Sequence, residues 1–404
     1  MVELLIRPTG IDPALMSWFL APLARRPAGS VIVQPRLVAN AELVDRYPAF
    51  EVAARQAGVP FLVDPRTPLL QDVQYPSHRW AQLPFGDHRL LTPSDLSPDR
   101  CVRLVEETVE HQVNAGATKI IAPYLHINRA NDGWLHRQRM LLRQTRATLE
   151  RHNIQLELIA IIDLWWRLLD RSSWPEVLHP LLREVAAAGC DEIGLAGSLV
   201  DDGARPQDRV AALLAAIRRC GLVAPTLAWN QGRVGELCVA GGAAGYGTGI
   251  GWGERCNTPD FLRQQRVEPE ADAPRSARPI WIEKLGRAIP PRTIERLADH
   301  RGIAPDLPCP AHTPCCPDGV HSLLRDDGRH HTLIARVRSL RELAQVEPAF
   351  RWRHLHDRAE SGLDLANRIN ALAERRGYTR VDTAALRASI EVATHLRRRA
   401  RRVA

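Results

Sequence analysis

The sequence of 404 residues contains only two lysines, Lys119 and Lys284, although lysine and arginine together number 54. Arginine therefore carries nearly all of the positive charge, and the formal net charge is +8. A basic balance favours polyanions such as nucleic acid. An arginine excess is equally typical of a GC-rich genome. The basic end HLRRRARRVA has the same two interpretations, phosphate contact or a solvated helix end.

The sequence also lacks long apolar runs and a regular cysteine framework. No run reaches the roughly 18 apolar residues that a membrane-spanning helix needs. The opening stretch MVELLIRPTG has a strand-like pattern, so we expect no signal peptide. Eight unevenly spaced cysteines do not form the framework of a secreted disulfide-rich domain. We therefore expect a cytoplasmic protein without a membrane span.

Short β-rich segments alternate with longer amphipathic segments over the first 260 residues. The strand candidates are residues 3–7, 30–35, 60–64, 118–124, 156–163, 191–197, 225–230 and 245–250. Helical patterns separate most of them. Ser97 and Pro98 suit the start of one helix, and Gly116, Gly189 and Gly221 suit left-handed caps at helix ends. Eight buried strands alternating with helices predict an α/β fold, a (β/α)₈ TIM-like barrel.

The polar, proline-bearing segment RVEPEADAPRSARP follows the barrel pattern and suits a linker. A chain of this length can bury the core of one large barrel plus an appendage. We expect four regions: the barrel at 1–262, a linker and helix at 263–300, a zinc-binding Cys/His region with the last barrel helix at 301–346, and a helical extension at 347–404.

A TIM barrel carries its chemistry at the carboxyl ends of its strands. The residues that follow the predicted strands are Asp64, Tyr124, His126, Asn128, Asp163, Trp165, Trp166, Gly197, Ser198, Asn230, Gln231 and Glu254. Carboxylates, amides and aromatic rings together suit a flat ligand that forms hydrogen bonds, such as a base or a sugar. Each residue taken singly could instead cap a strand or order a loop. Arg66 and Arg129 also lie just past strand ends and are candidates for phosphate contact.

The proline-rich segment LPCPAHTPCCPDG concentrates three cysteines and a histidine. Structural zinc takes four thiolate or imidazole ligands. The candidate ligands are Cys309, His312, Cys315, Cys316, His330 and His331. The first three have a spacing that one turn can present, and one of the last two would complete the set. The adjacent cysteines compete, because neighbouring side chains rarely both face one ion. We expect structural Zn²⁺; the alternative is a loop with free thiols or a transient disulfide.

The order of several segments resembles the tRNA-guanine transglycosylase family over roughly residues 55–345. In that family a strand ending in T-D-S-G-G-F-Q precedes an L-T-P-E helix, and here PFLVDPRTPLLQ precedes LTPSDLSPDRCV. AIIDLWW, DEIGLAGSL and APTLAWNQG occupy the places of later strand ends in that family. CPAHTPCC and RHHTLIARVRSLREL occupy the places of its zinc cluster and last barrel helix. The resemblance implies that Asp64 contacts the target base or assists the exchange, and it places Gln71 at the motif's glutamine.

The family nucleophile is an aspartate in F-D-C-V-x-P-T-R, whereas the corresponding region here, AAGYGTGIGWGERC, has no aspartate. Glu254 is the nearest carboxylate, and Asp163 is the other candidate. The resemblance implies exchange of a purine for a deazapurine base in tRNA or DNA, through a carboxylate that attacks the anomeric carbon. The target base would have to leave any stack.

Two alternatives to base exchange stay open. The first is a non-catalytic relative that keeps the barrel and the zinc and binds nucleic acid or a partner protein; the missing aspartate favours it. The second is an unrelated barrel enzyme on a small metabolite, with Asp163 and His126 as acid and base. A homodimer is a further option for the assembly.

Overall fold

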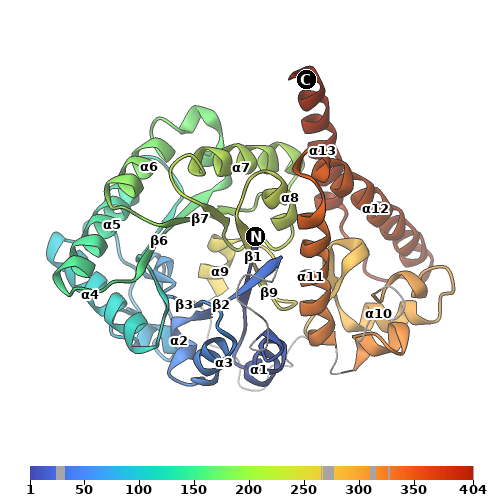
Figure 1. Ribbon diagram of the computed structural model, residues 1–404, viewed down its shortest axis with the longest axis horizontal. Coiled ribbons are helices and arrows are strands. Elements are labelled where there is room, and N and C mark those ends of the chain that lie inside the picture. Colours follow the sequence, from blue (N-terminus) through green and yellow to red (C-terminus); the bar gives the residue numbers. More distant parts are fainter. Residues whose placement is uncertain (24–31, 265, 267–276, 310–314, 326–327, 404) are drawn as a thin grey trace.

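The structure is a computed structural model that describes residues 1–23, 32–264, 266, 277–309, 315–325 and 328–403. Eight parallel strands form a barrel with helices around it, and each of the eight predicted strands overlaps one of them (Figure 1). The second begins at Val33 and continues to Asn40, five residues beyond its predicted end. The strands are β1 (Val2–Arg7), β2 (Val33–Asn40), β3 (Phe61–Asp64), β4 (Lys119–Ile121), β6 (Glu157–Trp165), β7 (Glu192–Ser198), β8 (Thr226–Ala228) and β9 (Gly245–Gly249). A short additional strand, β5 (His126–Ile127), pairs with β6.

The strands follow one another around the barrel in the order β3-β2-β1-β9-β8-β7-β6-β4, and every neighbouring pair is parallel. A hydrogen bond of 2.8 Å from the backbone N–H of Thr118 to the carbonyl of Phe61 connects the two ends of this series. The barrel is therefore nearly closed, and the predicted TIM-like fold is confirmed.

The helices that cover the strands are α1 (Pro13–Leu20), α2 (Ala41–Val44), α3 (Ala49–Ala57), α4 (Pro98–Asn114), α5 (Trp134–Arg151), α6 (Leu178–Ala187), α7 (Pro206–Cys220), α8 (Gly235–Ala240) and α9 (Thr258–Gln264). The hydroxyl of Ser97 accepts the N–H of Arg100 and caps α4, as predicted. Gly116 and Gly189 have the expected positive φ of 77° and 57°. Gly221 has φ −61°, so the predicted left-handed cap there is wrong.

Alternation along the strands produces two apolar layers. Leu5 packs inside the barrel with Leu62 and Ile159, while its neighbours Leu4 and Ile6 pack between the strands and the helices. The barrel interior is not apolar throughout. At the amino end of the strands the guanidinium of Arg36 donates to both oxygens of Glu192, at 2.6 and 2.7 Å, and pairs with Glu3. This ion network fills the end of the barrel opposite to the strand carboxyl ends.

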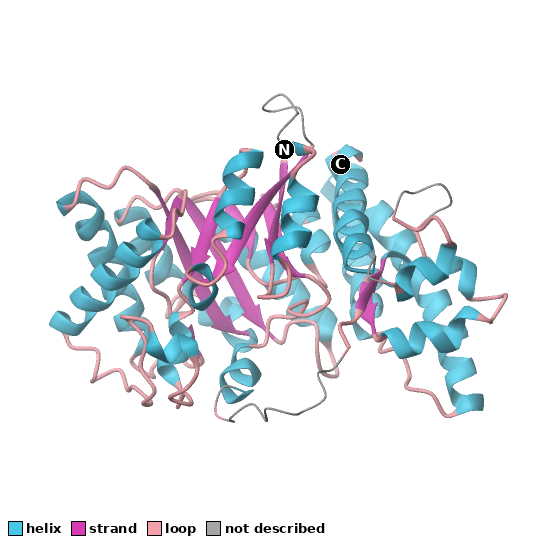
Figure 2. Ribbon diagram, turned by 90° about the horizontal axis from the view of Figure 1, so that it is seen from below, coloured by secondary structure: helices cyan, strands magenta, loops and turns pink. Residues whose placement is uncertain are grey.

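The C-terminal part packs along one side of the barrel (Figure 2). Its elements are β10 (Ile280–Ile282), β11 (Arg287–Ile289), α10 (Pro291–Ala298), α11 (Gly328–Gln345), α12 (Arg351–Arg376) and α13 (Ala384–Val403). Helix α11 joins the two parts, because Leu333 and Leu340 belong to the barrel core whereas Ala335 belongs to a separate C-terminal core. None of the described helices has the length and apolar character to cross a bilayer.

The close packing of β9 against β1 predicts that a larger residue at Gly245 destabilises the barrel. A methyl group added at Gly245 would lie 2.3 Å from the carbonyl oxygen of Glu3, a backbone atom that cannot move without shifting β1. We expect Gly245→Ala to lower the free energy of unfolding by about 2–3 kcal/mol, measured by denaturant titration. Gly302→Ala is the matched control, because no described atom lies within 4 Å of the added methyl. Equal stability of the two variants would contradict the tight β1–β9 packing.

Candidate functional site

A cavity of about 230 Å³ opens at the carboxyl ends of the barrel strands. Its polar lining consists of Arg7, Thr9, Asn40, Asp64, Arg66, Tyr124, Asp163, Asn230, Arg255, Asn257 and Thr258, and its aromatic lining includes Trp229, Trp252 and Phe261. Sites for drug-sized ligands occupy roughly 300–1,000 Å³. This mouth cavity therefore suits a smaller group, of the size of a single heterocycle or sugar.

Asp64 is a hydrogen-bond centre on the wall of the mouth cavity, and it is 1% exposed. Its Oδ2 accepts from Nη1 of Arg7 at 2.7 Å, and its Oδ1 accepts from the Tyr124 hydroxyl at 2.9 Å and from the backbone N–H of Arg66 at 3.0 Å. Burial and the charge of Asp64 raise the pKa of Tyr124 well above its usual value, so this phenol stays a neutral donor. Asp64 thus orders three donors from three different strand ends.

Arg7 and Trp229 form a second part of the cavity wall, and the sequence analysis missed both. The guanidinium carbon of Arg7 lies 4.5 Å from the centre of the Trp229 ring, in a cation–π contact. Nε and Nη2 of Arg7 and Nε1 of Trp229 are buried and have no hydrogen-bond partner within the described chain. A ligand that brings acceptor atoms would satisfy these donors. Arg7 ends the first predicted strand, so the strand-end rule could have found it.

Asp163 is the other carboxylate on the cavity wall, and it is 3% exposed. Its Oδ1 lies 2.9 Å from Nδ1 of His126, and its Oδ2 accepts from the Thr258 hydroxyl at 2.9 Å. A carboxylate has about four acceptor positions, so free lone pairs remain on both oxygens. Nε2 of His126 is buried and has no partner among the described residues. The pair combines a carboxylate with an imidazole, two groups that enzymes use in acid–base and nucleophilic catalysis.

The predicted amide residues and Gly197 have different positions. The side-chain amide of Gln71 makes two hydrogen bonds to the backbone of His126. It donates to the carbonyl at 2.8 Å and accepts from the N–H at 2.6 Å. Gln231 donates to the carbonyl of Gly197 at 2.9 Å and so connects the ends of two strands. Asn230 lines the mouth cavity with a positive φ of 57°. Of these residues only Asn230 borders the cavity; Gln71, Gly197 and Gln231 support its walls.

Glu254 lies outside the mouth cavity. It is buried, pairs with Arg336 of α11, and accepts from the Thr248 hydroxyl at 3.1 Å. Its carboxylate therefore serves the contact between the barrel and α11. Arg66 pairs with Glu42 and stacks on Phe261 at the cavity rim, 4.2 Å from the ring centre.

A neighbouring cavity of about 480 Å³ is bordered by His126, Asn128, Arg129 and the end of α9. The structure therefore places the two predicted phosphate-contact arginines, Arg66 and Arg129, at different cavities.

A cluster of three thiols and one imidazole lies between α11 and the chain before it. Cys309, Cys315, Cys316 and His331 are all buried, and their ligand atoms lie within 4.8 Å of one another. The shortest separations are 3.1 Å from Cys316 Sγ to His331 Nδ1, 3.2 Å from Cys309 Sγ to the same nitrogen, and 3.4 Å between Cys309 and Cys315 Sγ. A disulfide has an S–S distance of about 2.05 Å, and all three cysteines are free thiols.

This geometry fits a metal ion. Two sulfurs bound at about 2.3 Å to one tetrahedral zinc ion are ~3.8 Å apart, within the range seen here. His331 Nε2 lies 2.7 Å from the carbonyl of Trp281, which makes Nε2 the donor and leaves the Nδ1 lone pair facing the sulfurs. Hydrogen bonding with Cys309 and Cys316 lowers the pKa of Cys315, which favours its thiolate form. The cluster could therefore hold a metal ion with no further ligand.

The structure shows which of the predicted metal ligands belong to this cluster. His331 takes part, whereas the ring of His330 packs edge-on against Trp18, with ring centres 4.1 Å apart. His312 lies outside the described residues. The two adjacent cysteines, which were expected to compete for one ion, both belong to the cluster, since both Sγ atoms lie within 4.0 Å of His331 Nδ1.

Comparison with family models found no match, and neither did comparison with curated proteins. Among solved structures, a thiamine phosphate pyrophosphorylase from Pyrococcus furiosus is 11% identical, with a TM-score of 0.28, over 66% of this chain and 94% of that one. An HpcH/HpaI aldolase from Desulfitobacterium hafniense DCB-2 is 12% identical, with a TM-score of 0.32, over 66% and 93%. An aldolase called QR15 is 14% identical, with a TM-score of 0.32, over 65% and 95%. Similarity at this level carries no argument about the reaction.

The thiol–imidazole cluster predicts a bound metal. We expect elemental analysis of freshly purified protein to find one metal ion per chain, and a strong chelator to lower the Tm, because a structural metal contributes directly to folding. Cys315→Ser should lose the metal. Cys190→Ser is the control, since Cys190 is a free cysteine elsewhere in the fold and should keep it. Protein that contains no metal, and whose Tm does not respond to added metal or chelator, would contradict the site.

The hydrogen-bond donors around Asp64 predict that removing its charge lowers the stability of the fold. Asp64→Asn keeps the shape but removes the charge opposite Arg7 and replaces one acceptor by an amide donor. We expect a loss of roughly 3 kcal/mol in the free energy of unfolding, as for breaking a buried ion pair. Tyr124→Phe removes one hydrogen bond and should cost only about 1 kcal/mol. An Asp64→Asn variant as stable as the parent would refute the proposed role of this carboxylate.

Proposed function

We propose that the mouth cavity binds a purine-like base, and that the protein exchanges this base in tRNA or DNA. The observation that carries the proposal is the meeting, in one cavity, of the Trp229 ring, the unpartnered donors of Arg7 and the carboxylate of Asp163. Trp252, which lines the same cavity and is 38% exposed, offers a stacking surface to a planar base. The donors match the acceptor atoms on a purine edge. The family resemblance agrees with this ligand.

In this proposal Asp163 is the nucleophile. Its carboxylate attacks the anomeric carbon, the glycosidic C–N bond breaks, and the base leaves with the bonding electron pair. The departing base takes up a proton, and the incoming base loses the proton of its attacking ring nitrogen. That nitrogen forms the new bond to the same carbon as the bond from the carbon to Asp163 breaks. Thr258 and His126 hold the carboxylate in place through its two oxygens. The free N–H groups of Arg7 stabilise the negative charge on the departing base.

A nucleic-acid substrate must present its base to this cavity outside the stack. Arg129, at the neighbouring cavity, is the candidate for phosphate contact, because Arg66 and Arg255 at the mouth cavity are already paired with carboxylates. Binding through phosphates weakens steeply as the salt concentration rises.

We further propose that the metal is Zn²⁺ with a structural role. Three thiolates and one imidazole are a ligand set typical of structural zinc, and thiolates select soft or borderline ions over Mg²⁺ or Ca²⁺. Four protein ligands leave no open coordination position for substrate.

One observation favours a second candidate, an acid–base enzyme on a small metabolite. Nε2 of His126 has no partner in the described structure, and its Nδ1 is held by Asp163, as in a carboxylate–imidazole catalytic pair. Such an enzyme would use His126 as the proton carrier and would require no nucleic acid.

Base exchange is tested with the carboxylate variants. We expect the parent protein to incorporate labelled guanine or a labelled 7-deazaguanine into tRNA or DNA, and Asp163→Asn to lose at least about a hundredfold in rate, because the amide is a poor nucleophile. Asp208→Asn, at an exposed position on α7, is the control and should keep the parent rate. Glu254→Gln should lower the stability and leave the rate per folded molecule unchanged.

Three results would separate the candidate functions. Exchange that survives Asp163→Asn would refute the proposed nucleophile. Salt-sensitive binding of nucleic acid without exchange would favour the non-catalytic relative. The absence of both would leave the small-metabolite enzyme.

A further inference from the structure

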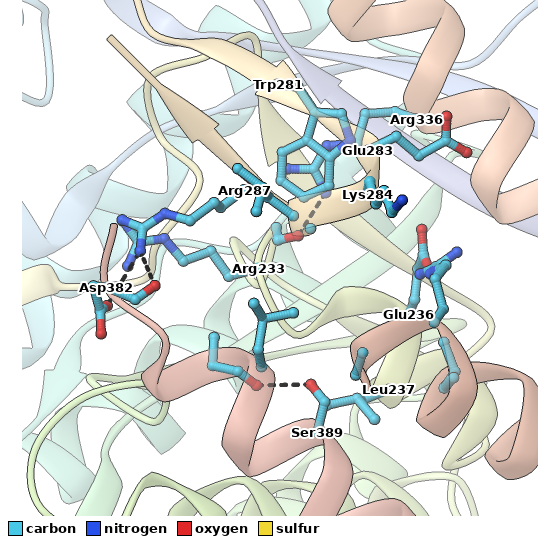
Figure 3. Close-up of a pocket in the computed structure, with 18 residues that line it drawn as sticks. Arg233, Glu236, Leu237, Trp281, Glu283, Lys284, Arg287, Arg336, Asp382 and Ser389 are labelled. Carbon is cyan, nitrogen blue, oxygen red and sulfur yellow. Dashed lines mark hydrogen bonds and ion pairs between the residues drawn. The ribbon is translucent and has the colours of Figure 1, made fainter. Parts of the chain in front are cut away.

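A second polar cavity lies away from the barrel mouth, between the barrel and the C-terminal elements (Figure 3). Its walls come from the start of α8, the β10–β11 hairpin, α11, α12 and the start of α13. Figure 3 shows Trp281 and Arg336 together on one wall, Arg233 and Arg287 side by side on the next, and Ser389 across from them. The cavity volume is about 60 Å³. One water needs roughly 15 Å³ by the same measure, so the space holds a few waters or one small ion.

Three N–H groups on this lining are without a partner. Nε1 of Trp281, Nε of Arg287 and Nε of Arg336 are buried and have no hydrogen-bond partner within the described residues. Trp281 is 4% exposed and Arg336 is 1% exposed. Buried donors in folded proteins are almost always satisfied by protein, water or ligand. Three of them on one small cavity indicate an occupant that brings several acceptors.

The carboxylates on the lining are already paired. Glu236 pairs with Arg358 and also accepts from the Ser339 hydroxyl at 2.6 Å. Asp382 pairs with Arg287 at 3.4 Å.

The third lining carboxylate, Glu283, pairs with Arg338, which lies outside the lining. The basic lining residues are Arg233, Lys284, Arg287, Arg336 and Arg358. Each of these five basic groups has a carboxylate partner, and the partners of Arg287 and Arg358 are themselves on the lining.

The partners of the other three basic groups lie behind the walls. Arg233 pairs with Asp201, Lys284 with Asp306 and Arg336 with Glu254, and none of these carboxylates lines the cavity. The lining residues therefore include more donor side chains than acceptor side chains. Burial lowers the pKa of Arg336 to about 10, as expected for a desolvated guanidinium that its neighbours do not fully compensate.

We propose that this cavity is a binding site for a tetrahedral oxyanion of the phosphate type, held by Trp281, Arg287 and Arg336. Its oxygens accept from the indole and the two guanidinium groups, and so satisfy the three N–H groups that have no partner among the described residues. The bound anion connects the β10–β11 hairpin with α11, and so fastens the C-terminal part to the barrel. This site is independent of base exchange at the barrel mouth.

The test compares phosphate with chloride on the full chain. Inorganic phosphate should raise the Tm above that in chloride of equal ionic strength, and titration calorimetry should give one site per chain. Trp281→Phe removes the indole N–H but keeps an aromatic ring beside Arg336. We expect this variant to bind phosphate roughly tenfold more weakly or worse, since it loses a hydrogen bond to a charged group. Arg287→Gln should weaken binding by at least as much.

The control is Arg301→Gln, an exposed arginine in the same part of the chain, which should bind phosphate as the parent does. Should a variant fail to fold, ³¹P line broadening on the parent protein, with sulfate as competitor, still reports the site. The proposal is overturned if phosphate acts no differently from chloride, or if Trp281→Phe and Arg287→Gln both bind it like the parent.

A further arm distinguishes the two sources of the anion. A short single-stranded RNA that displaces inorganic phosphate assigns the site to a backbone phosphate, whereas RNA that does not compete assigns it to the free ion.

Discussion

One helix, α11, packs against both the barrel and the C-terminal part, and its position determines how the two meet. Arg336 pairs with Glu254 of the barrel, donates to the carbonyl of Gly232 at 2.6 Å, and stacks over Trp281 of the hairpin. A buried guanidinium is costly unless its partners remain in place, so these contacts define one position of the helix. The same helix presents His331 to the thiols on its other side. The thiol–imidazole cluster and the second polar cavity therefore both depend on the position of α11.

The barrel mouth depends in a similar way on a carboxylate. Asp64 collects donors from Arg7 at the end of β1, from Tyr124 after β4, and from the turn after β3. The hydrogen bonds between these strand ends exist before any ligand arrives. A wall that is already ordered loses little entropy on binding, and its dipoles need no reorganisation during a reaction. The residue that the family resemblance singles out thus shapes the cavity through its neighbours.

The sequence was sufficient for the parts of the fold that follow from local pattern. Alternating apolar strands, the cap at Ser97 and the glycines after two helices are local features, and each occurs where predicted. The side of the barrel to which a side chain points, and its partner there, could not be predicted from local pattern. Glu254 follows the last strand, as a mouth residue would, but its partner Arg336 is distant in sequence.

Trp229 shows the same limit. It lies inside a predicted strand, where an indole can face either side of the barrel wall. The adjacent Cys315 and Cys316 both face the imidazole, which spacing alone argued against.

These placements narrow the chemistry that the mouth could perform. Asp64 and Asp163 are the carboxylates among the described residues that line the cavity. The oxygens of Asp64 are occupied by Arg7, Tyr124 and a backbone N–H, so attack by this group would first break the contacts that hold the wall together. Glu254 is committed to α11. Asp163 has two side-chain contacts, from His126 and Thr258, so acceptor positions remain on its oxygens. Of the two carboxylates on the lining, Asp163 is therefore the better candidate for the proposed nucleophile.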